Sequence, residues 1–456
     1  MRAAGHALAA LLLASASAEA QNGNIFNRTG SGARAAGMAN AFIAVSDDGT
    51  ASSWNPAGLG QLRKPELSIV TSTLGASYGT SGFRARDDSA TYSPTEASYS
   101  STYLDFASLA VPFSIGGMPV TMQASWRRLY DLSFQQNVST TQEPTTPGGP
   151  PPLATFATNA NSTGGIDLAS VSGAIKLTPR MALGMNVNFW QGAWEDHQST
   201  AIALPGTEQP PLFVKHDQTN GVSGTNVGVG LLLTYPRWSV GVAYQGALTG
   251  DYTSSGQTAT SLTPPPTPVS AAAPMHFPQE LGAGVSWRPA DRWTTALDLT
   301  WDDWSEATVT PPGGSAVDIF NGVPIERSGI ADTLSANLGA ECLFHGEGHV
   351  IPLRFGVAWE PQGARSAYTL DPVHFVMLAA GTGYNTNTIK FDAAFQYRWA
   401  RFRDGDNFTL EGGSPELPSA VGLRDVKRWT IKLSLIVRVT DTDKLHRGIK
   451  KVFGGG

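Results

Sequence analysis

The segment IKFDAAFQYRW, residues 389–399, decides the fold class. Its large apolar residues fall at every second position, and charged or polar residues occupy most of the positions between them. Successive side chains of a strand point to opposite faces, so this spacing predicts a β-strand with one apolar and one polar face. Residues 225–235 and the closing segment WTIKLSLIVRV, residues 429–439, repeat the pattern.

Such strands form either a soluble sheet with one solvated face or a membrane barrel with a polar lumen, and the connections favour the barrel. Tight turns at one membrane face and long loops at the other are typical of outer-membrane barrels. Short turns are predicted near residues 113–117, 178–180, 235–237, 289–291, 345–349 and 383–387. Long loops are predicted near residues 80–101, 135–163, 195–222, 253–276, 309–330, 361–372 and 402–426. This alternation predicts an all-β fold, a transmembrane antiparallel barrel of about 14 strands.

Composition narrows the class further. The chain has 456 residues, a net charge of −6 and one cysteine, Cys342, which excludes an intramolecular disulfide framework. The acidic balance gives no reason to expect nucleic acid as a partner. Beyond the N-terminal segment no run of roughly 18 apolar residues occurs, which excludes helical spans.

The first residues, MRAAGHALAALLLASASAEAQ, predict a secretory signal peptide. Arg2 precedes a short apolar stretch, and the small-residue site Ala18–Ala20 predicts cleavage before Gln21. An uncleaved anchor is the alternative, but the apolar stretch is much shorter than the roughly 20 residues that span a bilayer. We therefore expect residues 1–20 to be removed and the mature chain to reside in the outer membrane of a Gram-negative bacterium, with multiple passes.

A barrel of about 14 strands leaks unless something fills it, because barrels of 16 to 18 strands leave an open aqueous channel. Residues 21–62 precede the first strand, are rich in small residues and suit close packing against a wall. Pro56 fixes a bend within Asn55-Pro56-Ala57. We expect residues 21–62 to form a luminal hatch, residues 63–440 the barrel, and residues 441–456 a periplasmic tail.

The stretch GARAAGMANAFIAVSDDGTASSWNPAGL, residues 32–59, resembles the hatch of the FadL-type outer-membrane transporters, which carry long-chain fatty acids or aromatic hydrocarbons. The resemblance implies a 14-stranded barrel, loop capture of an apolar ligand, a luminal pocket near the hatch, and lateral exit beside a kinked third strand. It places Ile25 and Phe26 against the pocket and makes Asn55, Pro56 and Ala57 the gating bend. The tail after the last strand departs from the family, whose barrels usually end on an aromatic residue in that strand.

The third strand, MPVTMQASWRRLYDLSF, contains the candidate kink at Arg127 and Arg128. Alternation places Arg128 on the lipid face, where a mid-membrane arginine costs roughly 2 to 4 kcal/mol. A bulge that turns Arg128 inward would remove this cost and open the wall. The alternative is an Arg128 that snorkels at the outer headgroup level.

Two long outer loops, residues 201–215 and 261–277, contain apolar residues that folding alone does not explain. Ordinary loop packing would account for them, and an external surface that captures the ligand is the functional interpretation. The candidates for this surface are Leu204, Leu212, Phe213, Val214, Leu262, Met275 and Phe277.

Two motifs suggest other chemistry. GASYG, residues 75–79, fits the nucleophile pattern of hydrolases, but no helix pattern follows it. HGEGH, residues 345–349, lies in a tight turn, where metal binding is less favoured than a structural role. We therefore expect no catalytic residue, no metal and no cofactor.

The expected function is passive transport of a hydrophobic small molecule by a protein that is not an enzyme. Outer-membrane lipid and lipopolysaccharide would surround a monomer. The alternative is a structural or secretion-associated barrel that binds a protein partner. Charges of both signs on the predicted luminal face favour networks that brace the hatch, although some basic side chains could meet a ligand carboxylate.

Overall fold

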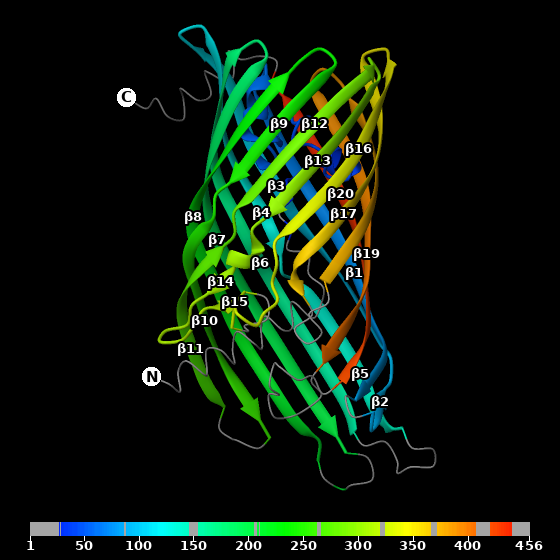
Figure 1. Cartoon of the computed structure of the whole chain (residues 1–456). Coiled ribbons are helices and arrows are strands. Elements are labelled where there is room, and N and C mark those ends of the chain that lie inside the picture. Colours follow the sequence, from blue (N-terminus) through cyan, green and yellow to red (C-terminus); the bar gives the residue numbers. More distant parts are fainter. Residues whose placement is uncertain are drawn as a thin grey trace.

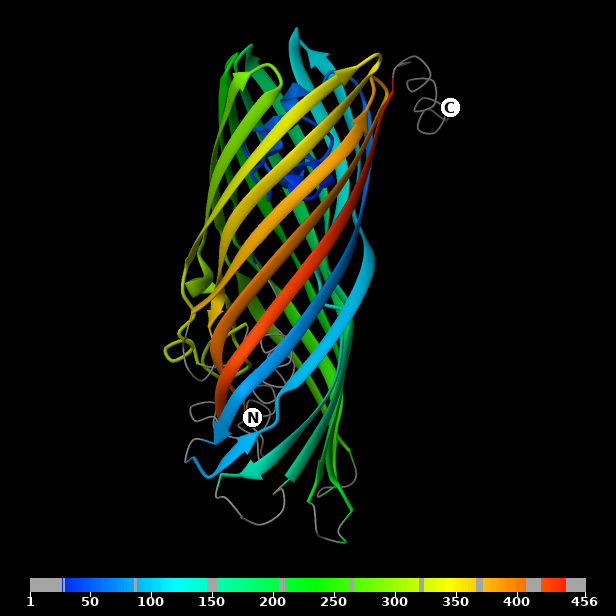
Figure 2. The same ribbon diagram turned by 90° about the vertical axis from the view of Figure 1, so that its right-hand side faces the viewer.

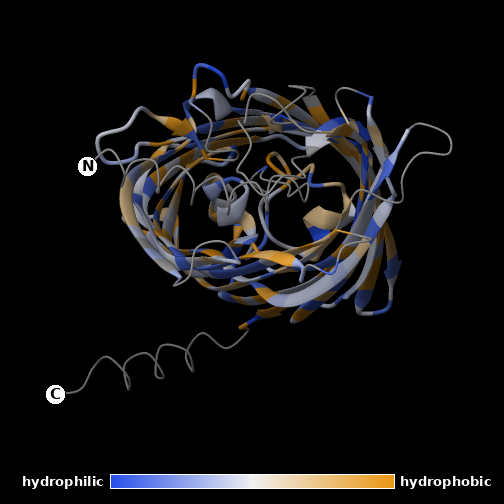
Figure 3. Cartoon of the chain, turned by 90° about the horizontal axis from the view of Figure 1, so that it is seen from below, coloured by the Kyte–Doolittle hydropathy of each residue, from blue (hydrophilic) through white to orange (hydrophobic). Residues whose placement is uncertain are grey.

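The computed structural model describes residue 27 and residues 29–439, apart from 86–87, 146–153, 205–207, 209, 262–265, 320–323, 366–371 and 407–419. Within this part the strands form one antiparallel sheet that closes on itself as a tall barrel (Figures 1 and 3). Eleven wall strands are continuous and three consist of two pieces, which confirms the predicted 14-stranded barrel. No helix among the described residues is long and apolar enough to cross a membrane. The predicted signal peptide and the tail 441–456 lie outside the described residues.

The continuous wall strands are β1 (Glu66–Ala85), β3 (Thr95–Ile115), β6 (Ala154–Thr178), β7 (Met181–Ala203), β8 (Leu212–Thr234), β13 (Trp293–Asp302), β16 (Thr333–Gly346), β17 (His349–Arg365), β18 (Pro372–Asn385), β19 (Ile389–Asp406) and β20 (Ala420–Arg438). The interrupted ones are β4 (Met118–Asp131) with β5 (Phe134–Pro144), β9 (Trp238–Gln245) with β10 (Leu248–Thr260), and β11 (Thr267–Phe277) with β12 (Glu280–Ala290). Smaller pieces are β2 (Ala90–Tyr92), β14 (Thr308–Val309) and β15 (Val317–Asp318).

Pairing of the first and last strands closes the ring. β1 runs antiparallel to β20, from Glu66 opposite Arg438 to Ala85 opposite Ala420. Most backbone groups of the wall can then bond to a neighbouring strand, which is what allows strands to cross hydrocarbon without helices.

The outward face is apolar, as the alternation predicts. Along β17, Leu353, Phe355 and Val357 are exposed, whereas Arg354 between them is fully buried toward the lumen. The same pattern recurs around the ring, so an apolar wall surrounds a polar interior.

Residues 29–62 lie inside the barrel, close to the end at which short turns join the strands (Figure 2). We call this segment the hatch. It contains the helix α2 (Ala33–Gly37) and two 3₁₀ turns, η1 (Ala51–Ser53) and η2 (Pro56–Gln61). A third 3₁₀ turn, η3 (Trp304–Glu306), follows β13.

Five of the long loops predicted from the sequence are wrong in extent because strands occupy part of them: 80–101, 135–163, 195–222, 253–276 and 402–426. Residues 181–203, 212–234, 248–260 and 267–277 are strands that continue far along the barrel. Their polar side chains bond to one another: the Gln218 amide donates to Ser254 Oγ at 2.6 Å, and the Tyr252 hydroxyl donates to Asn220 Oδ1 at 2.8 Å. A polar segment without an apolar face is therefore not necessarily a loop. Here polar side chains of neighbouring strands hydrogen-bond to one another across the sheet.

Candidate functional site

The hatch folds compactly because its residues are small. Ala33, Ala35 and Ala36 of α2 are buried, and Ala39 and Asn40 have positive φ of 51° and 69°, which ends the helix and turns the chain. A side chain as small as alanine allows the backbone to approach the wall closely. The sequence pattern therefore specifies a plug that makes contact chiefly through its backbone.

The wall has glycines where the hatch touches it. A Cβ added at Gly184, Gly230 or Gly241 would lie within 3.0 Å of hatch atoms, namely those of Pro56 and Ala57, Asn55, and Ile43 respectively. No larger residue fits at these positions without displacing the hatch. Gly184 of β7, Gly230 of β8 and Gly241 of β9 are thus part of the wall surface that contacts the hatch.

Polar side chains of the wall bind the hatch carbonyl oxygens from several sides. The donors include Gln123 to Gly49 at 2.6 Å, Ser239 to Ala44 at 2.6 Å, Asn337 to Ala39 at 2.8 Å, Gln396 to Ala36 at 3.0 Å and Asn186 to Ser52 at 3.2 Å. They come from β4, β9, β16, β19 and β7. The hatch is therefore fixed by strands on opposite sides of the lumen.

Asn55, Pro56 and Ala57 form one hydrogen-bonded bend. Asn55 is fully buried, and its Oδ1 accepts from the Ala57 amide at 3.1 Å. Its Nδ2 donates to the carbonyls of Ile43 at 3.2 Å and of Leu231 at 3.1 Å. Pro56 begins η2, a position where its missing N–H leaves no bond unmade. One side chain thus caps η2 and ties the hatch both to itself and to β8.

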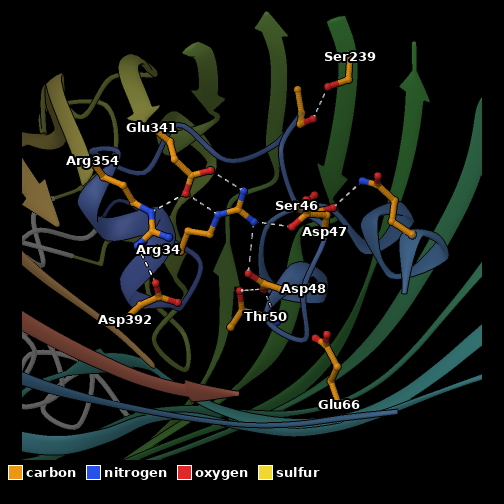
Figure 4. Close-up of polar contacts among 12 residues, drawn as sticks. Arg34, Ser46, Asp47, Asp48, Thr50, Glu66, Ser239, Glu341, Arg354 and Asp392 are labelled. Carbon is orange, nitrogen blue, oxygen red and sulfur yellow. Dashed lines mark hydrogen bonds and ion pairs between the residues drawn. The ribbon is translucent and has the colours of Figure 1, made fainter. Parts of the chain in front are cut away.

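Buried ion pairs surround the start of the hatch (Figure 4). Arg34 binds Asp47 within the hatch and Glu341 on β16, the latter at 2.9 Å. Glu341 also accepts from Arg354 at 2.7 Å, and Arg354 binds Asp392 at 2.8 Å. Charges of both signs therefore connect hatch and wall, as expected from the charges of both signs on the predicted luminal face.

The third wall strand is broken. β4 ends at Asp131 and β5 begins at Phe134, and the register against β6 shifts between Arg128 and Tyr130. On the other side, pairing of β3 with β4 stops at Phe106 opposite Arg127. Residues 95–104 of β3 pair with β1, and residues 95–105 pair with no described residue of the third strand. Farther along, β2 pairs with β5 and closes the wall again. We call this stretch the lateral break.

The two arginines at the break differ in direction. Arg127 faces the lumen, where its guanidinium reaches the hatch carbonyls of Thr29 and Ser53 at 3.5 and 3.4 Å. Arg128 stays in the outward register and forms an ion pair with Asp167 on β6. The bulge lies one residue after Arg128, and it turns Tyr130 into the lumen. Arg128 is neutralised by Asp167 and also lies 3.7 Å from a carboxylate oxygen of buried Asp131.

A large apolar cluster lies inside the barrel beside the lateral break. Phe277 is at its centre, with ring centroids 5.3 Å from Trp190, 5.5 Å from Trp304 and 5.8 Å from Tyr130. We call these four rings and the buried residues packed with them the aromatic cluster. The packed residues are Leu132, Ile166, Leu168, Trp194, Val222, Leu248, Tyr252, Ala273, Met275, Ala307, Val309 and Val317.

A separate polar cavity lies between the hatch and the wall. Hatch residue Trp54 and wall residues Arg127, Gln245 and Asp298 are among those that line it. Its volume of about 60 Å³ is well below the roughly 150 Å³ of a cavity that holds benzene. The cavity is therefore too small for an apolar ligand of the size of benzene.

The predicted capture residues are not all in loops. Leu204 is exposed just after β7, but Leu212, Phe213 and Val214 belong to β8, and Leu262 lies outside the described residues. Met275 and Phe277 are in β11 and buried in the aromatic cluster, so their placement on an external surface is wrong. Ala273, Met275 and Phe277 are buried at every second position, and this alternation indicates a strand rather than a loop.

Ile25 and Phe26 lie outside the described residues. Among the residues that the structure describes, no three His, Cys, Asp or Glu side chains are grouped so as to hold a metal.

The chain matches, over residues 9–404, the family of outer membrane transport proteins described as OMPP1/FadL/TodX. It belongs to this family. No curated protein matches the chain.

Solved structures agree with the fold. A Pseudomonas aeruginosa FadL homologue superimposes with a TM-score of 0.61 and 14% identity, covering 91% of this chain and 99% of that one. The P. putida toluene transporter TodX gives 0.57 and 13%, covering 91% and 100%. The CymD monoaromatic hydrocarbon channel gives 0.52 and 14%, covering 91% and 99%. The chain is thus an outer-membrane β-barrel of a transport family, and the identity is low enough that the ligand has to be argued from its own residues.

Proposed function

We propose that this protein carries hydrophobic small molecules across the outer membrane without a chemical step, and releases them sideways into the bilayer at the lateral break. One observation carries the proposal: the aromatic cluster and the lateral break share Tyr130 and Leu132. An apolar ligand among these rings is therefore one side chain away from the place where the wall loses its backbone pairing.

Lateral release is favoured energetically. Leaving the lumen for periplasmic water exposes each CH₂ group at a cost of about 0.8 kcal/mol, whereas entry into bilayer hydrocarbon does not. The known relatives support the ligand class, since a toluene transporter and a monoaromatic hydrocarbon channel share the fold. The hatch blocks the direct path along the barrel axis, because wall donors hold it on opposite sides.

The test removes the bulge. Deleting Leu129 takes out the extra residue between Arg128 and Tyr130, which lets β4 continue in register with β6. We expect uptake of labelled hexadecanoic acid and toluene by cells that depend on this protein to fall to background, while folding of the barrel persists. Deletion of exposed Glu347 in the β16–β17 turn is the matched control. Unchanged uptake in the Leu129 deletion would contradict exit through the break.

Further parts of the proposal concern processing and assembly. The mature protein begins near Gln21, acts as a monomer, and is surrounded by outer-membrane lipid and lipopolysaccharide. Residues 21–62 act as the gating hatch, with Asn55, Pro56 and Ala57 as its rigid bend and Ile25 and Phe26 beside the ligand. Leu204, Phe213 and Val214 contribute to capture at the outer end, and residues 441–456 form a periplasmic tail.

A further inference from the structure

Four basic side chains lie on the outward face of β1, β19 and β20, near the end of the barrel that carries the long loops. They are exposed: Arg84 of β1, Arg401 and Arg403 of β19, and Lys427 of β20. The three strands are direct neighbours, because β20 pairs with β19 on one side and with β1 on the other (Figure 2). We call these four residues the basic patch.

Carboxylates on the same face only partly offset the basic patch. Among the residues whose side chains the structure describes, the outward acids beside it are Asp425 of β20 and the exposed Glu96 of β3. A carboxylate oxygen of Asp425 lies 3.5 Å from Nε of Arg401, whose side chain is still 61% exposed. Four basic groups against two acidic ones leave this face with a net positive charge.

The outward charges of β7 and β8 are balanced instead. Asp217 binds Lys215 at 2.9 Å and His197 at 2.8 Å, and Glu195 is exposed beside His197 on β7. A basic group that already binds a carboxylate attracts a further anion less strongly. An excess of positive charge is therefore a property of the face formed by β19, β20 and β1, and not of every charged face of the barrel.

Aromatic side chains border the basic patch on the side of the membrane midplane. Trp399 and Trp429 are each two residues, or about 7 Å, from Arg401 and Lys427 on the same faces of their strands. Tryptophan belts mark the boundary between lipid headgroups and hydrocarbon, so the patch is at the depth of the headgroups. Beyond the tryptophans the same two strands expose large apolar side chains, namely Phe391, Phe395, Ile431 and Leu433.

The GASYG motif, residues 75–79, lies in β1 beside the patch. Its Ser77 is paired in register with Lys427. Gly79 follows on the same face, and a Cβ added there would have its nearest neighbouring atoms 3.8 Å away or more. A hydroxyl and an open glycine next to an ammonium group leave space for a bulky headgroup, and the hydroxyl can donate to a phosphate or sugar oxygen.

We propose that the basic patch binds the phosphate groups of lipopolysaccharide, the phosphorylated glycolipid of the outer leaflet, while its acyl chains lie along the apolar side chains below. Guanidinium groups match phosphate in bidentate geometry, and an ammonium adds a point charge. Each basic side chain near a membrane surface strengthens binding of an anionic headgroup by a factor of roughly 5. The site is on the outer side of the wall, so it does not depend on the proposed ligand path through the lumen.

The experiment measures binding of lipopolysaccharide to the purified full-length protein in detergent, and of the same lipopolysaccharide after removal of its phosphate groups. Arg401→Gln/Lys427→Gln should weaken binding of the intact glycolipid roughly 10- to 30-fold, because two of the basic side chains are lost. Its affinity for the dephosphorylated form should equal that of the wild type. Arg63→Gln/Lys64→Gln removes an exposed arginine and lysine at the short-turn end of the barrel and is the matched control, which should bind like the wild type.

Unchanged binding of intact lipopolysaccharide in Arg401→Gln/Lys427→Gln, or an equal loss for the dephosphorylated form, would overturn the proposal. An equal loss of binding to phosphatidylglycerol would also overturn it, because the occupant would then be an ordinary anionic phospholipid. Folding is checked by the heat-dependent gel shift, which should be preserved because both side chains are exposed and exposed ion pairs contribute little to stability.

Discussion

Single residues show how closely the hatch is fitted to its wall. Asn55 makes three hydrogen bonds from one buried side chain, and Gly230 has no side chain where that amide lies. Asn55 would be recognised as a bend residue from its sequence neighbours alone. Its bond to Leu231 joins positions 176 apart in the chain, which no local pattern reveals.

Asn55→Ala should loosen the hatch and leave the barrel intact. Three bonds disappear and the Ala57 amide and two carbonyls lose a partner, at a cost of about 1 to 3 kcal/mol. We expect faster proteolysis of the hatch and higher ion conductance in planar bilayers, with an unchanged heat-dependent gel shift. Asn387→Ala in an exposed turn is the control. Parental conductance in Asn55→Ala would show that this bend does not hold the hatch.

Gly230→Ala should have a similar effect from the wall side. The added Cβ would meet Asn55 Oδ1 and Pro56 Cδ within 3.0 Å, so the bend has to move away from β8. Gly79→Ala is the matched control, because the atoms nearest to its Cβ are 3.8 Å away or more. Conductance that rises in Gly230→Ala and not in Gly79→Ala is the expected result; equal behaviour of the two variants would count against the fit.

At the scale of elements, charge joins pieces that are far apart in the chain. Arg34 of α2, Glu341 of β16 and Arg354 of β17 form one buried network, in which Glu341 is shared by two guanidinium groups. Arg237 and Asp291 lie in two short turns and form an ion pair that is exposed to water. The two pairings have similar distances and very different surroundings.

Glu341→Gln should therefore be much more damaging than Asp291→Asn. Breaking a buried pair leaves uncompensated charge at a cost of about 3 to 5 kcal/mol, whereas an exposed pair contributes about 0 to 1 kcal/mol. The temperature at which the heat-dependent gel shift occurs should fall clearly for Glu341→Gln and barely for Asp291→Asn. A similar fall in both would mean that the network does not connect hatch and wall as the structure indicates.

The whole molecule is a tall barrel whose apolar outer band faces lipid and whose lumen is filled near one end by the hatch (Figures 1 and 2). Stability of the ring comes from pairing of neighbouring strands. Among the described wall residues, the long stretches that lack a strand partner on one side include residues 95–105 of β3 and residues 267–274 of β11. The first of these stretches lies at the lateral break, which shares Tyr130 and Leu132 with the aromatic cluster. The gap in strand pairing and the proposed ligand path therefore lie in the same part of the wall.

Removal of the signal peptide predicts the N-terminal residue of the mature protein. With cleavage after Ala20, the mass of the purified protein should correspond to a chain that begins at Gln21. Mass spectrometry of the intact protein checks this directly. A chain that retains residues 1–20 would favour the uncleaved-anchor alternative.

The sequence by itself determined the strand alternation, the 14-stranded ring and the small-residue hatch, because each depends on local spacing of side chains. Period 2 places Leu353 and Arg354 on opposite faces whatever the partner strand is. It could not show that Phe277 of a presumed loop joins Trp190 and Trp304, since that requires β11 to continue along the wall. It could not show that Arg424 binds Asp404, whereas Arg428 has no ion pair with a carboxylate among the described residues. Both facts depend on which strands become neighbours and in what register, and only the closed barrel decides that.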